Sequence, residues 1–251
     1  NLSDIAAMGG VPTSYLLALF RGPHTDAEWL RGFAEGLRLD KEHFGVKLLG
    51  GDSVSSPDRA AFSLTIIGTI GRGQAIRRNG AKPGDRVLVT GTIGDAGAGL
   101  AILQDRIKPA SAGTEKFLVD RHELPEPRVG VGPRLIGTAT SAIDVSDGLL
   151  ADLGHIATAS SVRIDIHAED IPLSEAFRTT GFSTLDAVTS GDDYELAFTA
   201  PADSAAKLSD LSRSTGVEIT EIGVIAEGEG VRLLDRDDNE IACDKPGWRH
   251  Y

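Results

Sequence analysis

Apolar segments of two kinds alternate along this chain of 251 residues, and this alternation limits the folds open to it. Short apolar or alternating runs indicate strands, and longer runs with apolar residues on one face indicate helices. Predicted strands cover residues 13–20, 46–49, 61–70, 86–90, 142–145, 162–166, 194–199, 217–225 and 231–235. Predicted helices cover residues 3–9, 26–44, 95–105, 115–122, 147–160, 172–177 and 203–214, with one more ending near 137. Because the two kinds interleave, we predict an α/β or α+β fold.

The segment 142–149 (AIDVSDGL) places two acids where a predicted strand passes into a predicted helix. Ser146 is a suitable helix N-cap, and Asp147 would follow in the first turn, where the helix dipole favours negative charge. Asp144 and Asp147 are three positions apart, so both carboxylates can face one pocket. With the Ser146 hydroxyl they would suit Mg²⁺ and phosphate, but a helix cap with one spare acid explains the same pattern.

Acids recur in other turns of the chain. They are Asp4 at a helix start, Asp52 after Gly50 and Gly51, and Asp192 and Asp193 after Gly191. In an open α/β sheet the strand ends gather around the ligand crevice, but aspartate also favours turns for local reasons. The pattern therefore fits either a metal–phosphate site or a set of turn residues. Mg²⁺ is the expected metal, because the six histidines form no pair with zinc or iron spacing.

Composition narrows the class of protein. The net charge of −12 and the lack of a basic patch argue against nucleic acid as a partner. One cysteine, Cys243, argues against a disulfide framework and for a reducing, cytoplasmic location. No apolar run is long enough for a bilayer, and the first residues do not resemble a signal peptide. The chain begins with Asn1 and not with methionine, so we expect that residue 1 is not the natural start.

Other functional signals are weak. The glycines between Gly91 and Gly99 follow a strand but lack the G-x-G-x-x-G spacing, and no Walker A sequence occurs. Trp248 could stack on an aromatic ligand or serve as a packing lid. The segment 71–84, which holds four glycines and several basic residues, is the predicted junction between two domains, residues 1–78 and 79–251.

Five segments carry a resemblance to a known family: residues 1–9 (NLSDIAAMG), 48–52 (LLGGD), 79–85 (NGAKPGD), 142–149 (AIDVSDGL) and 190–196 (SGDDYEL). In this order they resemble the thiamine-monophosphate kinase family. That family belongs to a superfamily with aminoimidazole-ribonucleotide synthetase, selenophosphate synthetase and the hydrogenase-maturation protein HypE. The resemblance implies ATP-dependent phosphorylation of thiamine monophosphate to thiamine diphosphate, with several Mg²⁺ ions. It also implies a homodimer formed through the sheet of the first domain.

The resemblance assigns roles position by position. It implies that Asp4, Asp52, Asp144 and Asp147 bind metal, that Gly51, Asp52, Arg78 and Ser146 contact ATP, and that Asp192 and Trp248 contact the thiamine. The acceptor oxygen of a phosphomonoester is already anionic, so we predict no general base and no covalent phospho-enzyme. Another enzyme of the superfamily with a different acceptor and a non-catalytic Mg–nucleotide-binding fragment are the alternatives.

The chain departs from the family pattern in three places. No arginine follows Asp52 where the family usually has one, and the turn at 190–193 is one residue short, with Asp192 in place of glutamate. Family chains also have several dozen residues before the segment that matches Asn1. We therefore expect a partial first α/β domain, residues 1–78, which binds ATP and Mg²⁺ and forms the dimer. A whole second α/β domain, residues 79–251, would follow, with a mixed sheet and flanking helices.

Overall fold

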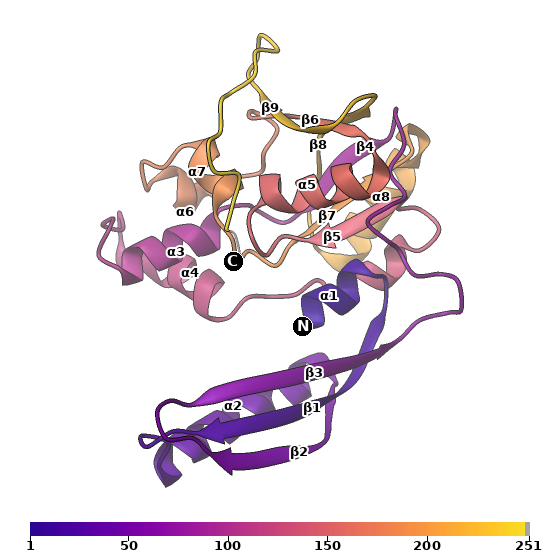
Figure 1. The fold of residues 1–251 in the computed structure, drawn as a ribbon. Helices are drawn as coiled ribbons and strands as arrows, with labels where there is room; N and C mark the ends of the chain where they lie inside the picture. Colours follow the sequence, from indigo (N-terminus) through magenta and orange to yellow (C-terminus); the bar gives the residue numbers. More distant parts are fainter. Residues whose placement is uncertain (249–251) are drawn as a thin grey trace.

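Two separate sheets organise the chain, and Figure 1 shows one below the other. The structure is a computed structural model and describes residues 1–248. The mixed α/β class predicted from the sequence is confirmed. The first part consists of α1 (Leu2–Ala7), β1 (Val11–Arg21), α2 (Ala27–Phe44), β2 (Lys47–Ser55) and β3 (Ala61–Thr69). Its sheet has the order β2-β1-β3, in which β1 pairs parallel with β2 and antiparallel with β3.

Helix α2 covers one face of this three-stranded sheet. The Asp26 carboxylate accepts the backbone N–H groups of Glu28 and Trp29, and the helix ends at Gly45, whose φ of 69° suits glycine. Trp29 stacks on Phe62 of β3, with 5.9 Å between ring centroids. This contact fixes the helix on the sheet face to which Phe62 belongs.

The opposite face of the same sheet carries exposed apolar side chains. Register and strand alternation place Leu16, Phe20, Val54 and Ile67 on it, and each is 39–43% exposed. Figure 1 shows no helix over this face. Four large, partly exposed apolar residues therefore share one bare sheet face.

The second part is built on a six-stranded sheet with the order β5-β7-β4-β8-β6-β9. Its strands are β4 (Arg86–Thr90), β5 (Ser141–Asp144), β6 (Arg163–His167), β7 (Leu196–Ala200), β8 (Ile219–Ala226) and β9 (Gly230–Leu234). Its helices are α3 (Asp95–Leu103), α4 (Ala112–Glu123), α5 (Leu149–Ser160), α6 (Glu175–Arg178), α7 (Thr184–Thr189) and α8 (Ala205–Thr215), with the 3-10 turns η1 (Gly132–Leu135) and η2 (Ala202–Ser204). All strand pairs are antiparallel except β6 with β9, so the sheet is mixed.

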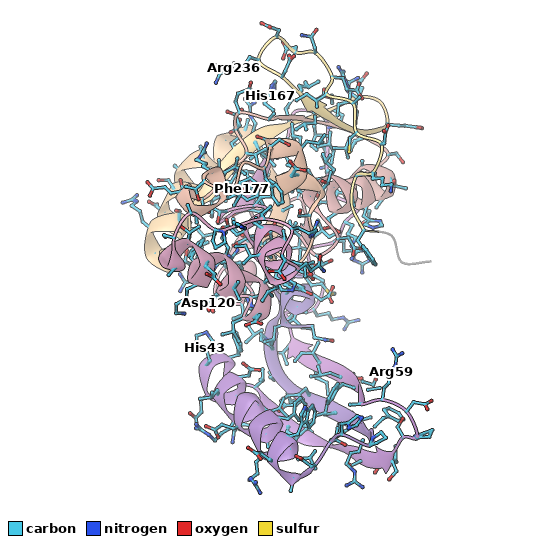
Figure 2. The ribbon with its side chains drawn as sticks, turned by 90° about the vertical axis from the view of Figure 1, so that its left-hand side faces the viewer. His43, Arg59, Asp120, His167, Phe177 and Arg236 are labelled. Atoms are coloured by element: carbon cyan, nitrogen blue, oxygen red, sulfur yellow. The ribbon has the colours of Figure 1, made fainter. Side chains whose placement is uncertain are left out.

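Two apolar clusters cover the two faces of the second sheet. The larger includes residues of α3, α5 and α7, and Figure 2 labels its Phe177, which is fully buried. The smaller includes Leu208 and Leu211 of α8 together with Ala6 and Ala7 of α1. Helix α1 thus packs on the second sheet although it precedes the first sheet in sequence, and this packing brings Asp4 to β5.

The two parts also meet beside α2. His43, labelled in Figure 2, lies near the end of α2 and its Nε2 is 3.0 Å from Oε1 of Glu126. A cavity of about 810 Å³ lies between α2 and residues 123–127, and none of the predicted site residues lines it. No helix among residues 1–248 is both long and apolar enough to cross a membrane.

Most predicted elements match the structure within a few residues, and three differ. The strand predicted at 46–49 continues to Ser55, the helix predicted to end near 137 is the 3-10 turn Gly132–Leu135, and α7 was not predicted as a helix. Strand β2 is longer because it pairs with β1 over its whole length, which local sequence does not reveal.

Candidate active site

The turn between β5 and α5 is held by a buried carboxylate rather than by Ser146. The prediction that Ser146 caps the helix and that Asp147 lies in its first turn is wrong: α5 begins at Leu149, and its N-cap is Gly148 with φ 120°. Oδ2 of Asp152 accepts the backbone N–H groups of Ser146 (3.0 Å) and Asp147 (3.1 Å). Burial raises the pKa of Asp152 to about 7, against the lowering effect of these two hydrogen bonds. The Ser146 hydroxyl is therefore not needed as a cap.

A second loop, residues 190–194, lies directly against this turn. The backbone N–H of Asp192 donates to the carbonyl oxygen of Ser146 (2.9 Å), and that of Tyr194 donates to Val145 (2.8 Å). The loops are so close that a Cβ on Gly191 would lie 2.3 Å from the Ser146 carbonyl oxygen. Glycine is required there because any side chain would separate the loops.

These two loops line a cavity of about 420 Å³, here called the tryptophan pocket. Its lining includes four predicted site residues: Ser146, Asp147, Asp192 and Trp248. The backbone N–H of Trp248 donates to the carbonyl oxygen of Asp147 (2.8 Å), which fixes the end of the described chain beside the turn. Arg106, which was not among the predicted site residues, also lines this pocket.

A second cavity of about 460 Å³, here called the acid pocket, shares no lining residue with the tryptophan pocket. Asp4, Arg78 and Asp144 line it, together with Arg77 and Asn79. Burial and then the neighbouring charge of Asp4 raise the pKa of Asp144. Asp4 and Asp144, beside the two arginines, fit a site for cations and phosphate oxygens.

Gly51 and Asp52 do not line either pocket. The expectation that Asp52 lies in a turn after the strand predicted at 46–49 is wrong, because it lies within β2, exposed and paired with Ala18 of β1. A Cβ on Gly51 would lie 1.7 Å from the carbonyl oxygen of Leu17, so this glycine permits the close approach of the two strands. Within one chain, Asp4 and Asp144 thus line the same pocket, whereas Asp52 lies in the three-stranded first sheet.

Within residues 1–248, three side chains of types that can bind a metal ion come close together. Carboxylate oxygens of Asp147 and Asp152 and a ring nitrogen of His155 lie within 4.8 Å of one another. The hard carboxylate oxygens at the turn suit Mg²⁺. Asp152 and His155 were not among the predicted ligands, since their spacing from Asp147 matches no standard metal motif.

A buried ion network is centred on Glu195, which directly follows the 190–194 loop in sequence. Glu195, which is fully buried, accepts hydrogen bonds from Thr90 Oγ1 (2.6 Å), Arg121 Nη2 (2.9 Å) and Arg128 Nε (2.6 Å). Asp193 is also fully buried and accepts backbone N–H groups at the start of α3. Asp193 was predicted from the sequence as one of the candidate site acids, whereas Glu195 was given no role; the alternation of side chains along segment 192–196 was the available signal.

Comparison with known proteins identifies the family. A family model described as AIR synthase related protein, N-terminal domain, matches residues 1–70, and the corresponding C-terminal domain matches residues 82–236. Thiamine-monophosphate kinase of Salmonella typhimurium is 39% identical over 255 residues, covering 100% of this chain and 77% of that protein. The Bacillus subtilis enzyme is 35% identical and is covered to 78%. The chain belongs to the thiamine-monophosphate kinase family.

Solved structures agree with this assignment. Thiamine-monophosphate kinase from Stenotrophomonas maltophilia K279a has a TM-score of 0.88 at 40% identity, covering 96% of this chain and 77% of that one. AaThiL complexed with AMPPCP and TMP has a TM-score of 0.85 at 31% identity, covering 100% and 77%. The hydrogenase-maturation protein HypE of E. coli, at 20% identity and a TM-score of 0.82, shares the fold. The family resemblance inferred from the sequence is confirmed, and the chain is that of a kinase.

Proposed function

We propose that this protein transfers the terminal phosphoryl group of ATP to thiamine monophosphate by direct in-line transfer. The observation that carries the proposal is the turn at 144–147, whose two acids face different cavities: Asp144 lines the acid pocket and Asp147 the tryptophan pocket. A nucleotide and a phosphorylated acceptor could thus approach the same turn from two sides. The binding of AMPPCP and TMP by AaThiL supports two such ligands.

The acid pocket suits the phosphate end of ATP. Arg78 would contact ATP phosphates, and Asp4 and Asp144 would hold Mg²⁺ ions in this pocket, with Asp147 as a further ligand from the tryptophan pocket. Bound Mg²⁺ would supply positive charge between the donor and acceptor phosphates. Two unit charges 4 Å apart repel by about 4 kcal/mol at an effective dielectric of about 20, so this neutralisation would lower the barrier to transfer.

The tryptophan pocket suits the thiamine group of the acceptor. The thiazolium ring is a cation, and the pocket offers the Asp192 carboxylate and the indole of Trp248. A carboxylate and an aromatic face together recognise such a ring through charge and cation–π attraction. Ser146 lies between Asp144 and Asp147 in the sequence, and its hydroxyl would contact the phosphate groups of the nucleotide. No side chain is assigned as a general base, because the attacking oxygen is already anionic.

The test is a coupled assay with Mg-ATP and thiamine monophosphate. Asp144→Asn removes one anionic ligand and is expected to lower kcat/KM by about 100-fold or more. Asp203→Asn, an exposed acid on η2, is the matched control and should keep wild-type activity. Full activity of Asp144→Asn would contradict the role given to this acid. Calorimetry that detects Mg-ATP binding without turnover would favour the non-catalytic alternative, and turnover with a different phosphorylated acceptor would favour the other superfamily enzyme.

We also propose a homodimer formed through the bare face of the first sheet. Leu16, Phe20, Val54 and Ile67 offer an apolar surface on which a second copy could pack. Asp52 is paired with Ala18, so it lies on this same face. Sedimentation of the purified chain tests the dimer.

A further inference from the structure

Two adjacent acids, Asp192 and Asp193, have opposite surroundings. Asp192 lines the tryptophan pocket, whereas the side chain of Asp193 points away and is fully buried. Oδ2 of Asp193 accepts the backbone N–H of Gly94 (2.7 Å), and Oδ1 accepts that of Ala96 (3.2 Å). Asp193 therefore caps α3 from a segment almost a hundred residues away, in place of a local cap, which Gly94 cannot provide.

The backbone on either side of Asp193 is strained. Asp192 has φ 67° and Tyr194 has φ 51°, a region that costs a residue with a side chain about 1 kcal/mol or more. Such a conformation persists only where surrounding contacts impose it. The contacts present are the hydrogen bonds of Asp192 and Tyr194 to the 145–146 turn on one side, and those of Asp193 to α3 on the other.

Asp193 also joins two walls of the tryptophan pocket. Gly97 and Leu100 of α3 line one wall together with Gln104, which directly follows the helix, and residues 190–192 line another. The walls touch closely, since a Cβ on Gly97 would lie 2.3 Å from Cβ of Ser190. The two hydrogen bonds of Asp193 thus join α3 to the loop that carries Asp192, whose Oδ1 also accepts the Tyr194 hydroxyl (3.3 Å).

We propose that Asp193 is a positioning residue for acceptor recognition: its buried carboxylate locks the 190–194 loop to α3 and thereby fixes Asp192 in the tryptophan pocket. Asp193 itself does not touch the substrate. The inference rests on the proposed function, in which Asp192 and this pocket bind the thiamine group.

The test compares Asp193→Asn with a matched buried acid. Asparagine keeps the shape but replaces one acceptor oxygen with an NH₂ group that faces a backbone N–H, so one of the two bonds is lost. The control is Asp85→Asn, a buried acid of the same domain that accepts the Lys82 N–H (3.0 Å) and the Thr140 hydroxyl (2.7 Å) and lines neither pocket. We expect Asp193→Asn to raise KM and the calorimetric Kd for thiamine monophosphate by about tenfold, with KM for ATP and kcat within about threefold of wild type. Asp85→Asn should leave all four values unchanged.

A double-mutant cycle with Asp192→Asn separates positioning from general damage. If Asp193 acts through Asp192, the double variant binds thiamine monophosphate no more weakly than Asp192→Asn alone. Additive losses, or an unchanged Kd in Asp193→Asn, overturn the inference. If Asp193→Asn does not fold, Gly97→Ala separates the same two walls and should give the same selective rise in KM; a normal KM there also overturns it. A wild-type chain that neither binds nor phosphorylates thiamine monophosphate refutes the proposed function instead.

Discussion

Replacing Glu195 with glutamine should destabilise the second part of the molecule far more than the loss of an ordinary ion pair. The Glu195 side chain is 0% exposed, and the side chains of Arg121 and Arg128 that pair with it are only 14% and 16% exposed. The substitution is nearly isosteric, so it changes charge and hydrogen bonding without leaving a cavity. Two guanidinium groups would then remain largely buried without their shared carboxylate.

The magnitude follows from that burial. Removing one partner of a buried ion pair costs about 3–5 kcal/mol, because the remaining charge loses its compensation but not its desolvation. The control is Glu35→Gln on α2, whose pair with Arg38 has side chains 56% and 47% exposed. Exposed pairs contribute about 0–1 kcal/mol, so the two glutamine variants should differ by several-fold in their effect.

Urea unfolding followed by circular dichroism measures both variants. Glu195→Gln should lower the midpoint without changing the slope m, which reports the surface exposed on unfolding. In a chain of this size the same loss lowers Tm by roughly 2–4 °C per kcal/mol. A free energy of unfolding for Glu195→Gln within about 1 kcal/mol of wild type would refute the assignment of Glu195 as the centre of a buried ion network.

Three further outcomes follow from other features. Burial raises the pKa of Asp152 to about 7, from about 3.9 in the unfolded chain, so the metal-free protein should lose stability as pH rises from about 4 to 7. The free energy of unfolding should fall by up to about 1.4 kcal/mol per pH unit, and Asp152→Asn should flatten that part of a stability–pH curve. Gly191→Ala should reduce both Tm and turnover, since its Cβ would meet a carbonyl oxygen at 2.3 Å, whereas Gly32→Ala, with open space in α2, should raise Tm slightly. Phe20→Lys on the bare sheet face should shift sedimentation of the proposed dimer toward monomer, and an unchanged dimer would place the interface elsewhere.

Elements with local signals were predictable from the sequence. Helix α2 has an acid at its N-cap, an apolar stripe and a glycine after its last residue, and its predicted and observed ends agree within one residue. The turn at 144–148 shows the limit of that reasoning. Ser146 is a good cap by residue type, but Asp152, a few residues further on, accepts the N–H groups of the turn, and α5 begins later than predicted.

Features set by contacts between distant segments were not predictable from local patterns. Asp52 was expected at a strand end, but pairing of β2 with β1 extends the strand through it to Ser55. Likewise α1 lies next to the first sheet in sequence but packs on the second, which is how Asp4 reaches Asp144. The sequence identified both acids as candidates, while their proximity depends on the packing of Ala6 and Ala7 against β5 and β7.

The pair Asp192 and Asp193 shows that residue type alone cannot distinguish an acid that faces a pocket from an acid that is buried and holds a loop in place. Both acids follow the same glycine, and a turn with ordinary φ angles gives no reason to bury one and expose the other. The positive φ values at Asp192 and Tyr194 turn the chain so that Asp193 points at the N–H groups of α3 while Asp192 faces the pocket. Burying a carboxylate is costly unless hydrogen bonds compensate it, and here one donor is aimed at each oxygen. The geometry of the 190–194 loop therefore depends on hydrogen bonds to the start of α3, and the role of Asp192 in the pocket depends on Asp193 being held by them.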